Sequence, residues 1–266
     1  MSLVRVLFVG DLVGLAGRRV LAEHFERLVD TLQVDFSIVN VENAADGLGV
    51  TGEIAEELFE MGVSCLTSGN HIWDKREIRD YIDIQPRLLR PANYPRDLPG
   101  SGLYVGATPL GVPVAVVNLM GRVFMPPVDD PFVVARPLVE QARKLAPLVI
   151  VDIHAEATSE KMAMGWHLDG LVTAVLGTHT HIQTADERIL EMGTAYLTDV
   201  GMTGPYDSVI GMDKHAVLAR FVQHTPARMT SARHDARLCA ALVEADPATG
   251  RAVRIERMML PSAVAP

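Results

Sequence analysis

Two histidines separated by one residue, His179 and His181, are the first candidates for chemistry in this sequence. They follow an apolar run, residues 171–176, that predicts a buried strand. Side chains at positions i and i+2 of an extended chain point to the same side. Just past a strand end, two imidazoles with this spacing can converge on one point, and neutral imidazole is the commonest metal ligand in proteins. A lone His-x-His pair is weak evidence, so a metal site requires matching ligands on other strands.

Matching side chains do follow other predicted strands. Apolar runs predict strands at residues 4–10, 36–42, 63–69 and 147–153, and the first three alternate with amphipathic helices at 18–33 and 52–61. This rhythm is typical of right-handed βαβ units, in which ligands bind at the carboxyl ends of the strands. The polar side chains at these ends are Asp11, Glu42, Asn43, Asn70, His71 and His154. We therefore expect them to gather at one edge.

Each of these side chains also has an ordinary structural explanation. An Asp can cap a loop or helix, a Glu can be a surface charge, Asn is a common turn residue, and single histidines are often half-buried. Their joint placement favours a shared site. A set of nitrogen and oxygen ligands without thiolate favours manganese, iron or zinc over a Cys-rich structural zinc site. The ligands suffice for two ions, which a bridging carboxylate would hold about 3.5–4 Å apart.

Composition limits the class of protein. The chain has 266 residues, 48% of them apolar, and a net charge of −9, so its overall field repels nucleic acid and anionic membranes. Cys65 and Cys239 lie in apolar stretches and are interpreted as buried free thiols of a reducing compartment. Neither a signal peptide nor a membrane-spanning run is recognisable, which predicts a soluble cytoplasmic protein without a membrane partner.

The remainder of the chain is less regular. We expect a helix at 74–84, a Pro- and Arg-rich loop at 86–102, a strand at 112–118 and helices at 131–146 and 159–167. A short strand at 194–198 leads into a turn-rich loop at 199–208, and a hairpin follows at about 236–260. Arg87, Arg90 and Arg122 are candidates for phosphate binding, with solvated loop charges as the alternative. The sequence shows no repeat and no interdomain linker.

The motif series resembles that of the calcineurin-like, dinuclear metallophosphoesterases. Their usual order is Asp-x-His, Gly-Asp, Gly-Asn-His, a lone His and Gly-His-x-His. Gly69-Asn70-His71 and His154 match, and Gly177–His181 matches with one added residue. The first motif departs from the pattern with Val13 in place of His, and the second has Glu42 in place of Asp. These departures, together with residues 178–186 and 199–208, resemble the YmdB-type subgroup over nearly the whole chain.

This resemblance implies an α/β fold: a two-sheet β-sandwich flanked by helices on both sides, in four αββα layers. Residues 1–266 would form one domain, with the hairpin completing a sheet. It also implies a ligand set and a proton donor. Asp11, Glu42, Asn43 and His181 would hold one metal, and Glu42, Asn70, His154 and His179 the other. Glu42 would bridge, Asn43 would replace the missing imidazole through its amide oxygen, and His71 would protonate the leaving oxygen.

The implied activity is hydrolysis of a small phosphodiester, a 2′,3′-cyclic nucleotide first and a 3′,5′-cyclic nucleotide second, by a metal-activated water. The cofactors would be two divalent or trivalent metal ions, with iron first and manganese or zinc as alternatives. Rival hypotheses are a phosphomonoesterase and a low-turnover regulatory protein that binds metal or nucleotide. A metal-dependent amidohydrolase places its His-x-His on the first strand, so motif order argues against it. The acidic balance disfavours nucleic acid, while RNA as a substrate and a homo-oligomer stay open.

Overall fold

Side chains of strand β1 (Val4–Val9) alternate between two apolar cores, which fixes the layered arrangement of the molecule. In the computed structural model, which describes residues 2–263, Val6 and Phe8 face a second sheet, while Leu7 and Val9 face helices. All four side chains are fully buried. Because a strand buried on both faces needs a cover on each side, sheet packs on sheet in the centre and helices lie outside.

The first sheet carries the N-terminal half of the predicted ligand set. Its strand order is β10–β11–β1–β2–β3, with β12 paired to β11. Strands β1, β2 and β3 run parallel, and β11 joins β1 in the antiparallel direction. The other strands of this sheet are β2 (Phe36–Asn40), β3 (Cys65–Thr67), β10 (Gly204–Pro205), β11 (Ala236–Asp246) and β12 (Arg251–Pro261). The predicted C-terminal hairpin is thus β11–β12, and it completes this sheet.

The second sheet carries the later histidines. Its order is β4–β5–β6–β7–β9–β8, in which β5, β6, β7 and β9 are parallel and the two edge strands are antiparallel to their neighbours. Its strands are β4 (Leu103–Ala107), β5 (Pro113–Met120), β6 (Leu148–His154), β7 (Ala174–Thr178), β8 (Arg188–Ile189) and β9 (Ala195–Leu197).

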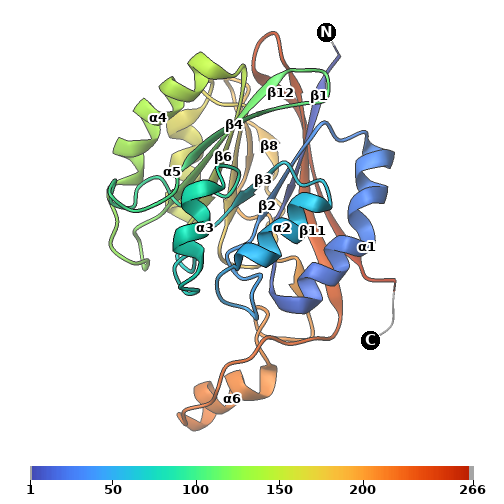
Figure 1. The fold of residues 1–266 in the computed structure, drawn as a ribbon, viewed down its shortest axis with the longest axis vertical. Coiled ribbons are helices and arrows are strands. Elements are labelled where there is room, and N and C mark those ends of the chain that lie inside the picture. Colours follow the sequence, from blue (N-terminus) through green and yellow to red (C-terminus); the bar gives the residue numbers. More distant parts are fainter. Residues whose placement is uncertain (1, 264–266) are drawn as a thin grey trace.

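Helices cover the outer faces of both sheets (Figure 1). Apolar side chains of α1, α2 and α3 pack on the first sheet, and those of α4 and α5 pack on the second. These helices are α1 (Gly14–Leu32), α2 (Gly52–Glu60), α3 (Ile78–Ile84), α4 (Pro131–Leu145) and α5 (Thr158–Leu168). The predicted α/β fold, a two-sheet sandwich with helices on both sides, is confirmed.

Several predicted boundaries are wrong, and the loops at the site explain why. The helix expected from residue 18 begins at Gly14, because the Gly17 N–H donates to the Val13 carbonyl and turns the expected loop into a first helical turn. The strand expected at 171–176 is β7, which continues to Thr178 because Thr178 pairs with His154 of β6. His154 therefore ends its strand instead of following it.

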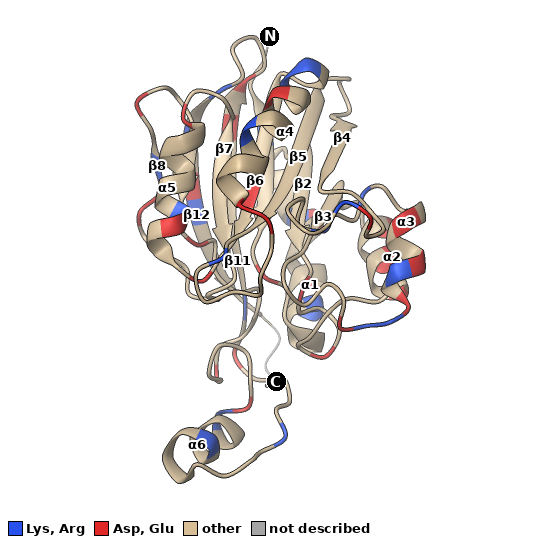
Figure 2. Cartoon of the chain, turned by 90° about the vertical axis from the view of Figure 1, so that its left-hand side faces the viewer, with Lys and Arg blue, Asp and Glu red and all other residues tan. Residues whose placement is uncertain are grey.

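Three further elements differ from those predicted from the sequence. The helix expected at 74–84 is confined to α3, and β4 had not been predicted. A sixth helix, α6 (Lys214–Gln223), also had not been predicted, and it stands apart from both sheets in Figures 1 and 2. We refer to residues 208–234, which carry α6, as the arm.

Within residues 2–263, no helix combines the length and the apolar character needed to cross a bilayer. Cys65 and Cys239 are buried free thiols, as expected. That residues 1–266 form one domain stays a prediction, and Met1 and residues 264–266 lie outside the described residues.

The core between the two sheets makes a first prediction. Ile38 is fully buried there, so Ile38→Ala should lower the free energy of unfolding by about 2–5 kcal/mol through lost transfer energy and a residual cavity. Val253 on β12 is 51% exposed, so Val253→Ala should change it by no more than about 0.5 kcal/mol. Urea denaturation measures both, and equal effects would contradict the sandwich core.

Candidate metal centre

The predicted ligands do converge at the carboxyl ends of parallel strands from both sheets. Asp11 and Glu42 follow β1 and β2, Asn70 follows β3, His154 ends β6, and His179 follows β7. Two groups of three side chains offer atoms that all lie within 4.8 Å of one another. One group is Glu42, His154 and His179, and the other is Asp11, Glu42 and His181. Glu42 belongs to both.

The first group crowds acceptor atoms around one ring nitrogen. His154 Nε2 lies 3.0 Å from Glu42 Oε2, 3.2 Å from Asn70 Oδ1 and 3.0 Å from His179 Nδ1. These are four nitrogen and oxygen atoms with lone pairs, and a proton on one nitrogen can satisfy only part of such a cluster. A cation satisfies all of them at once, so this donor set fits a metal ion.

The ligand atoms of the second group are more widely spaced. Asp11 Oδ1 lies 3.9 Å from His181 Nε2, and both side chains are buried. The Asn43 amide nitrogen donates to Glu42 Oε1 over 3.0 Å and lies 3.1 Å from His181 Nε2. The nitrogen therefore faces the site, where the sequence analysis expected the amide oxygen. Ligation through Asn43 Oδ1 requires the amide rotated by half a turn, and the two orientations differ only in which atom is nitrogen.

The outer ring nitrogens of all three histidines have partners that leave the inner nitrogens facing the site. Thr178 Oγ1 donates to Asp152 Oδ1 over 2.7 Å, so it accepts from His154 Nδ1 at 2.9 Å. His181 Nδ1 donates to the Ile210 carbonyl over 2.8 Å, and His179 Nε2 lies 3.2 Å from Glu156. Partners of this kind select the tautomer and orientation of metal-binding histidines.

The loop that carries the His-x-His pair is held in a strained backbone conformation. His179 has φ 100° and His181 has φ 66°, a left-handed region that side chains other than Gly rarely adopt. Thr180 between them donates its N–H and its hydroxyl to Asp199 Oδ2, over 3.1 and 2.7 Å. Lys161 Nζ donates to the same oxygen over 2.6 Å, and this ion pair is fully buried. The Lys161–Asp199 pair thus fixes the loop that presents both histidines.

Gly69 allows the close approach of the ligands. A Cβ at this position would lie 2.2 Å from His154 Nε2 and 2.3 Å from Glu42 Oε2, distances that no side chain tolerates. The Gly of the Gly69-Asn70-His71 motif is therefore a steric requirement of the site.

Burial and mutual charge shift the pKa values of the group strongly. Burial raises the pKa of the Asp11 carboxyl to about 6, against the positive charges of His181 and His154. Burial would raise the pKa of Glu42 as well, but the charge and hydrogen bond of His154 lower it to about 2. Burial alone would lower the pKa of His154, but the charge and hydrogen bond of Glu42 raise it to about 9. Burial and the charge of His154 lower the pKa of His179 to about 3. Such shifts are typical of functional sites.

Two further positions of the motif series, His71 and Val13, differ in exposure. The His71 side chain is 31% exposed, and its Nδ1 lies 2.8 Å from Asp74 Oδ2, while its backbone N–H donates to Glu42 Oε2. Val13 is buried, and backbone pairing places it beside Asn43. The apolar side chain at 13 lies close to Gly204 and Gly211.

The candidate phosphate-binding arginines have structural partners. Arg90 is buried and donates to three backbone carbonyls, Arg87 stacks on Phe59, and Arg122 pairs with Asp130. Lys161 and Asp152 were not among the site residues predicted from the sequence. Asp152 could have been recognised from the sequence, because a lone Asp inside the apolar run 147–153 is unusual in a buried strand.

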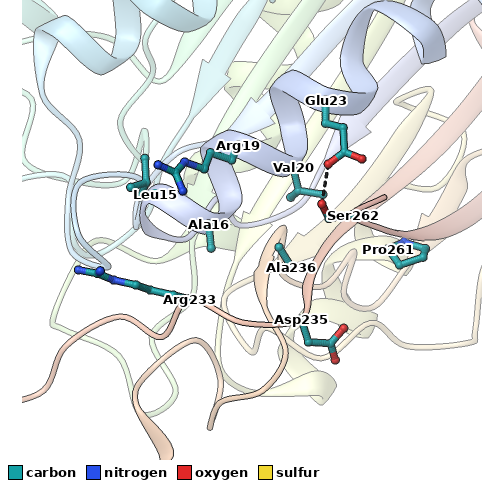
Figure 3. Close-up of a pocket in the computed structure, with 10 residues that line it drawn as sticks. All are labelled: Leu15, Ala16, Arg19, Val20, Glu23, Arg233, Asp235, Ala236, Pro261 and Ser262. Carbon is teal, nitrogen blue, oxygen red and sulfur yellow. Dashed lines mark hydrogen bonds between the residues drawn. The ribbon is translucent and has the colours of Figure 1, made fainter. Parts of the chain in front are cut away.

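Figure 3 shows the lining of a surface cavity of about 640 Å³. It is bounded by α1 and the ends of β11 and β12, and Leu15, Arg19, Arg233 and Pro261 are among its lining residues. It shares no residue with the two groups around Glu42.

A two-sheet αββα sandwich with a histidine and carboxylate cluster at its strand ends is the arrangement of a metallophosphoesterase. Comparison with known proteins agrees. The model of the YmdB-like protein family matches residues 7–258. The chain is 49% identical over 258 residues to a 2′,3′-cyclic-nucleotide 2′-phosphodiesterase of Bacillus subtilis, covering 97% of each sequence.

Solved structures show the same fold. A hypothetical protein from Thermus thermophilus superposes with a TM-score of 0.90 at 41% identity, over 97% of this chain and 99% of the other. A novel phosphatase from Mycoplasma pneumoniae superposes with a TM-score of 0.91 at 34% identity, over 98% and 95%. The chain belongs to the YmdB-like family, which confirms the family resemblance seen in the sequence.

The buried ion pair behind the histidine loop generates the next prediction. Lys161→Met would leave Asp199 buried without its cation and should lower the free energy of unfolding by about 3–5 kcal/mol. Adding Asp199→Asn removes the unpaired charge, so the double variant should be more stable than Lys161→Met alone. Chemical denaturation of the three proteins tests this, and a Lys161→Met protein as stable as wild type would refute it.

Proposed function

We propose that this protein is a dinuclear metal-dependent phosphodiesterase that hydrolyses cyclic nucleotides, 2′,3′-cyclic ones first and 3′,5′-cyclic ones within its scope. One observation carries the proposal. Three inner imidazole nitrogens and two buried carboxylates converge, while each outer nitrogen is already engaged. The Bacillus subtilis relative, a 2′,3′-cyclic-nucleotide 2′-phosphodiesterase, supports the substrate class.

The two groups of ligands define where each ion would be held. Glu42, Asn70, His154 and His179 would hold one ion. Asp11, Glu42 and His181 would hold the other, with Asn43 added once its amide is rotated. Ions held there would neutralise the phosphodiester and acidify a water for attack. Iron is our first choice of metal because the family resemblance implies it. The ligand set itself accepts manganese or zinc equally well.

The chain itself supplies orientation and a proton. The phosphodiester bears a negative charge and the protein is acidic overall, so binding needs a local positive centre. His71 stands at the rim of the site with Asp74 fixing its Nδ1, which leaves Nε2 to protonate a ribose oxygen as it leaves. The buried Thr178 and Asp152 pair holds the His154 ring against rotation.

A phosphomonoesterase is the second candidate, favoured by the likeness to the Mycoplasma pneumoniae protein described as a phosphatase. A low-turnover regulatory protein with the same ligands is the third. The separating experiment is a panel of metal-reconstituted protein with 2′,3′- and 3′,5′-cyclic nucleotides, an aryl phosphodiester and an aryl phosphomonoester. Multiple turnovers on diesters support the proposal. Faster turnover of the monoester, or binding with no turnover, would replace it.

Removing one ligand should abolish both metal binding and hydrolysis. Asp11→Ala and His154→Ala should each lower metal affinity by more than the ~10–100-fold typical of losing an outer partner of a ligand. Hydrolysis should fall in parallel. Metal analysis of the purified protein and rates on 2′,3′-cyclic AMP measure both effects. His167→Ala is the matched control, because His167 packs against Phe132 on the outer helices. Full activity in the two ligand variants would refute the assignment.

Removing the proposed acid should separate metal binding from turnover. His71→Ala should retain its metal but hydrolyse cyclic nucleotides about 10²–10⁴-fold more slowly. An aryl leaving group needs no proton, so the same variant should lose much less activity on an aryl phosphodiester. Equal losses on both substrates would show that His71 acts otherwise.

A further inference from the structure

Helix α6 carries an apolar stripe that no other part of residues 2–263 covers. Leu218, Phe221 and Val222 lie three and four positions apart, so they share one helix face, and they are 52%, 74% and 71% exposed. Val217, at the margin of this stripe, is the one buried side chain of the helix. Figures 1 and 2 both show α6 projecting away from the two sheets.

The two sides of the arm are joined to each other near its base, where the Ala232 N–H donates to the Gly211 carbonyl and the Asp213 N–H to the Thr230 carbonyl. Contacts with the body lie at the same end, where His181 Nδ1 donates to the Ile210 carbonyl and Lys214 Nζ donates to Asp207. Asp213 also caps α6 through the Ala216 N–H. A helix of this length is marginal in water, because most helical stability in proteins comes from packing of an apolar face. The exposed stripe therefore indicates a surface against which α6 packs in solution.

Charge indicates what that surface is. The arm carries four of the 24 Lys and Arg residues but one of the 33 Asp and Glu residues. The rest of the chain is correspondingly more acidic. Helix α2 has four exposed glutamates and no Lys or Arg: Glu53, Glu56, Glu57 and Glu60. Figure 2 shows more acidic than basic residues on α2 and the neighbouring α3, which carries Asp80, Asp83 and one cation, Arg79. The last residue of α3, Ile84, is 80% exposed.

We propose that the arm docks on a second copy of this chain, with α6 lying against the acidic face formed by α2 and α3 of that copy. The receptor offers negative charge for the exposed Arg220 and an exposed apolar side chain, Ile84, for the stripe, whereas Lys214 is already paired with Asp207 of its own chain. Because arm and receptor face belong to one chain, two copies exchange arms reciprocally and close a two-fold dimer. An anionic membrane or an RNA would attract the arm but meet repulsion from the acidic body.

The arm also reaches the candidate metal centre. Ile210 at its base has φ 45° and accepts a hydrogen bond from His181 Nδ1 through its carbonyl. Docking of the arm would fix this loop. Docking of the arm is inferred from the apolar stripe and the charges alone. It is tested by the mass of the particle in solution and not by activity, so it does not depend on the proposed function.

Sedimentation equilibrium over a wide concentration range tests the docking. Wild-type protein should sediment as a dimer, and Leu218→Ser/Phe221→Ser should reduce the mass by half while the circular dichroism spectrum stays that of a folded protein. The matched control is Leu110→Ser/Val133→Ser, which alters two similarly exposed apolar side chains outside the arm. The control should remain dimeric.

Charge reversal tests the receptor. Arg220→Glu should weaken the dimer at least tenfold. Adding Glu53→Arg/Glu60→Arg should restore it, because the charges of the arm and the receptor are then exchanged and still attract each other. A monomeric wild type, an unchanged mass in Leu218→Ser/Phe221→Ser, or no rescue would overturn the proposal. Binding of a monomeric wild type to phosphatidylserine vesicles or to RNA through the arm would also overturn it and name the other occupant.

Discussion

The Glu42 carboxylate, buried between the imidazoles of two sheets, is the constraint around which the rest of the structure is arranged. A buried charge is costly unless it is paired and fully hydrogen-bonded. Glu42 meets His154 at 3.0 Å, receives the Asn43 amide and accepts the His71 N–H. Gly69 has no side chain because one would occupy this space. The strand ends of both sheets must therefore lie close together around Glu42, and this requirement constrains how the two sheets pack.

A polar layer beneath the ligands shows how the two sheets are held in that arrangement. Asp152 of β6 accepts from the Asn40 amide of β2, from Thr178 of β7 and from Thr67 of β3, so one carboxylate joins both sheets. Burial raises its pKa, and the three donors oppose that shift. Its removal would release the His154 ring and loosen the contact between the sheets together. Structural and functional constraints therefore fall on the same residue.

The same site is supported from one side by the Lys161–Asp199 ion pair and from the other by the base of the arm. Both act on the loop that holds His179 and His181 in left-handed conformations. A strained loop keeps such conformations only if its surroundings over-determine them. We infer that arm docking, if it fixes the Ile210 carbonyl, belongs to this support, which would couple assembly to the geometry of the ligands.

The sequence by itself determined where the candidate ligands would meet. A residue type placed directly after an apolar run is a local feature, and parallel strands bring their carboxyl ends to one edge whatever lies between them. The convergence of Asp11, Glu42, Asn70, His154 and both late histidines was therefore predictable. The strand and helix rhythm predicted the α/β class, and the family resemblance added the αββα layers. Boundaries such as the start of α1 were not predictable, because hydrogen bonds formed in the folded loops extend them.

Only the tertiary structure decided how the candidate ligands are held. Lys161 and Asp199 lie 38 positions apart, and no local pattern in either stretch could pair them. The Asn43 amide meets the ring of His181, which lies 138 residues away in the sequence. The projection of α6 was equally hidden, because a short amphipathic stretch reads the same whether its apolar face meets its own core or another molecule. Local periodicity specifies elements and their faces, whereas partners across the chain are chosen by packing.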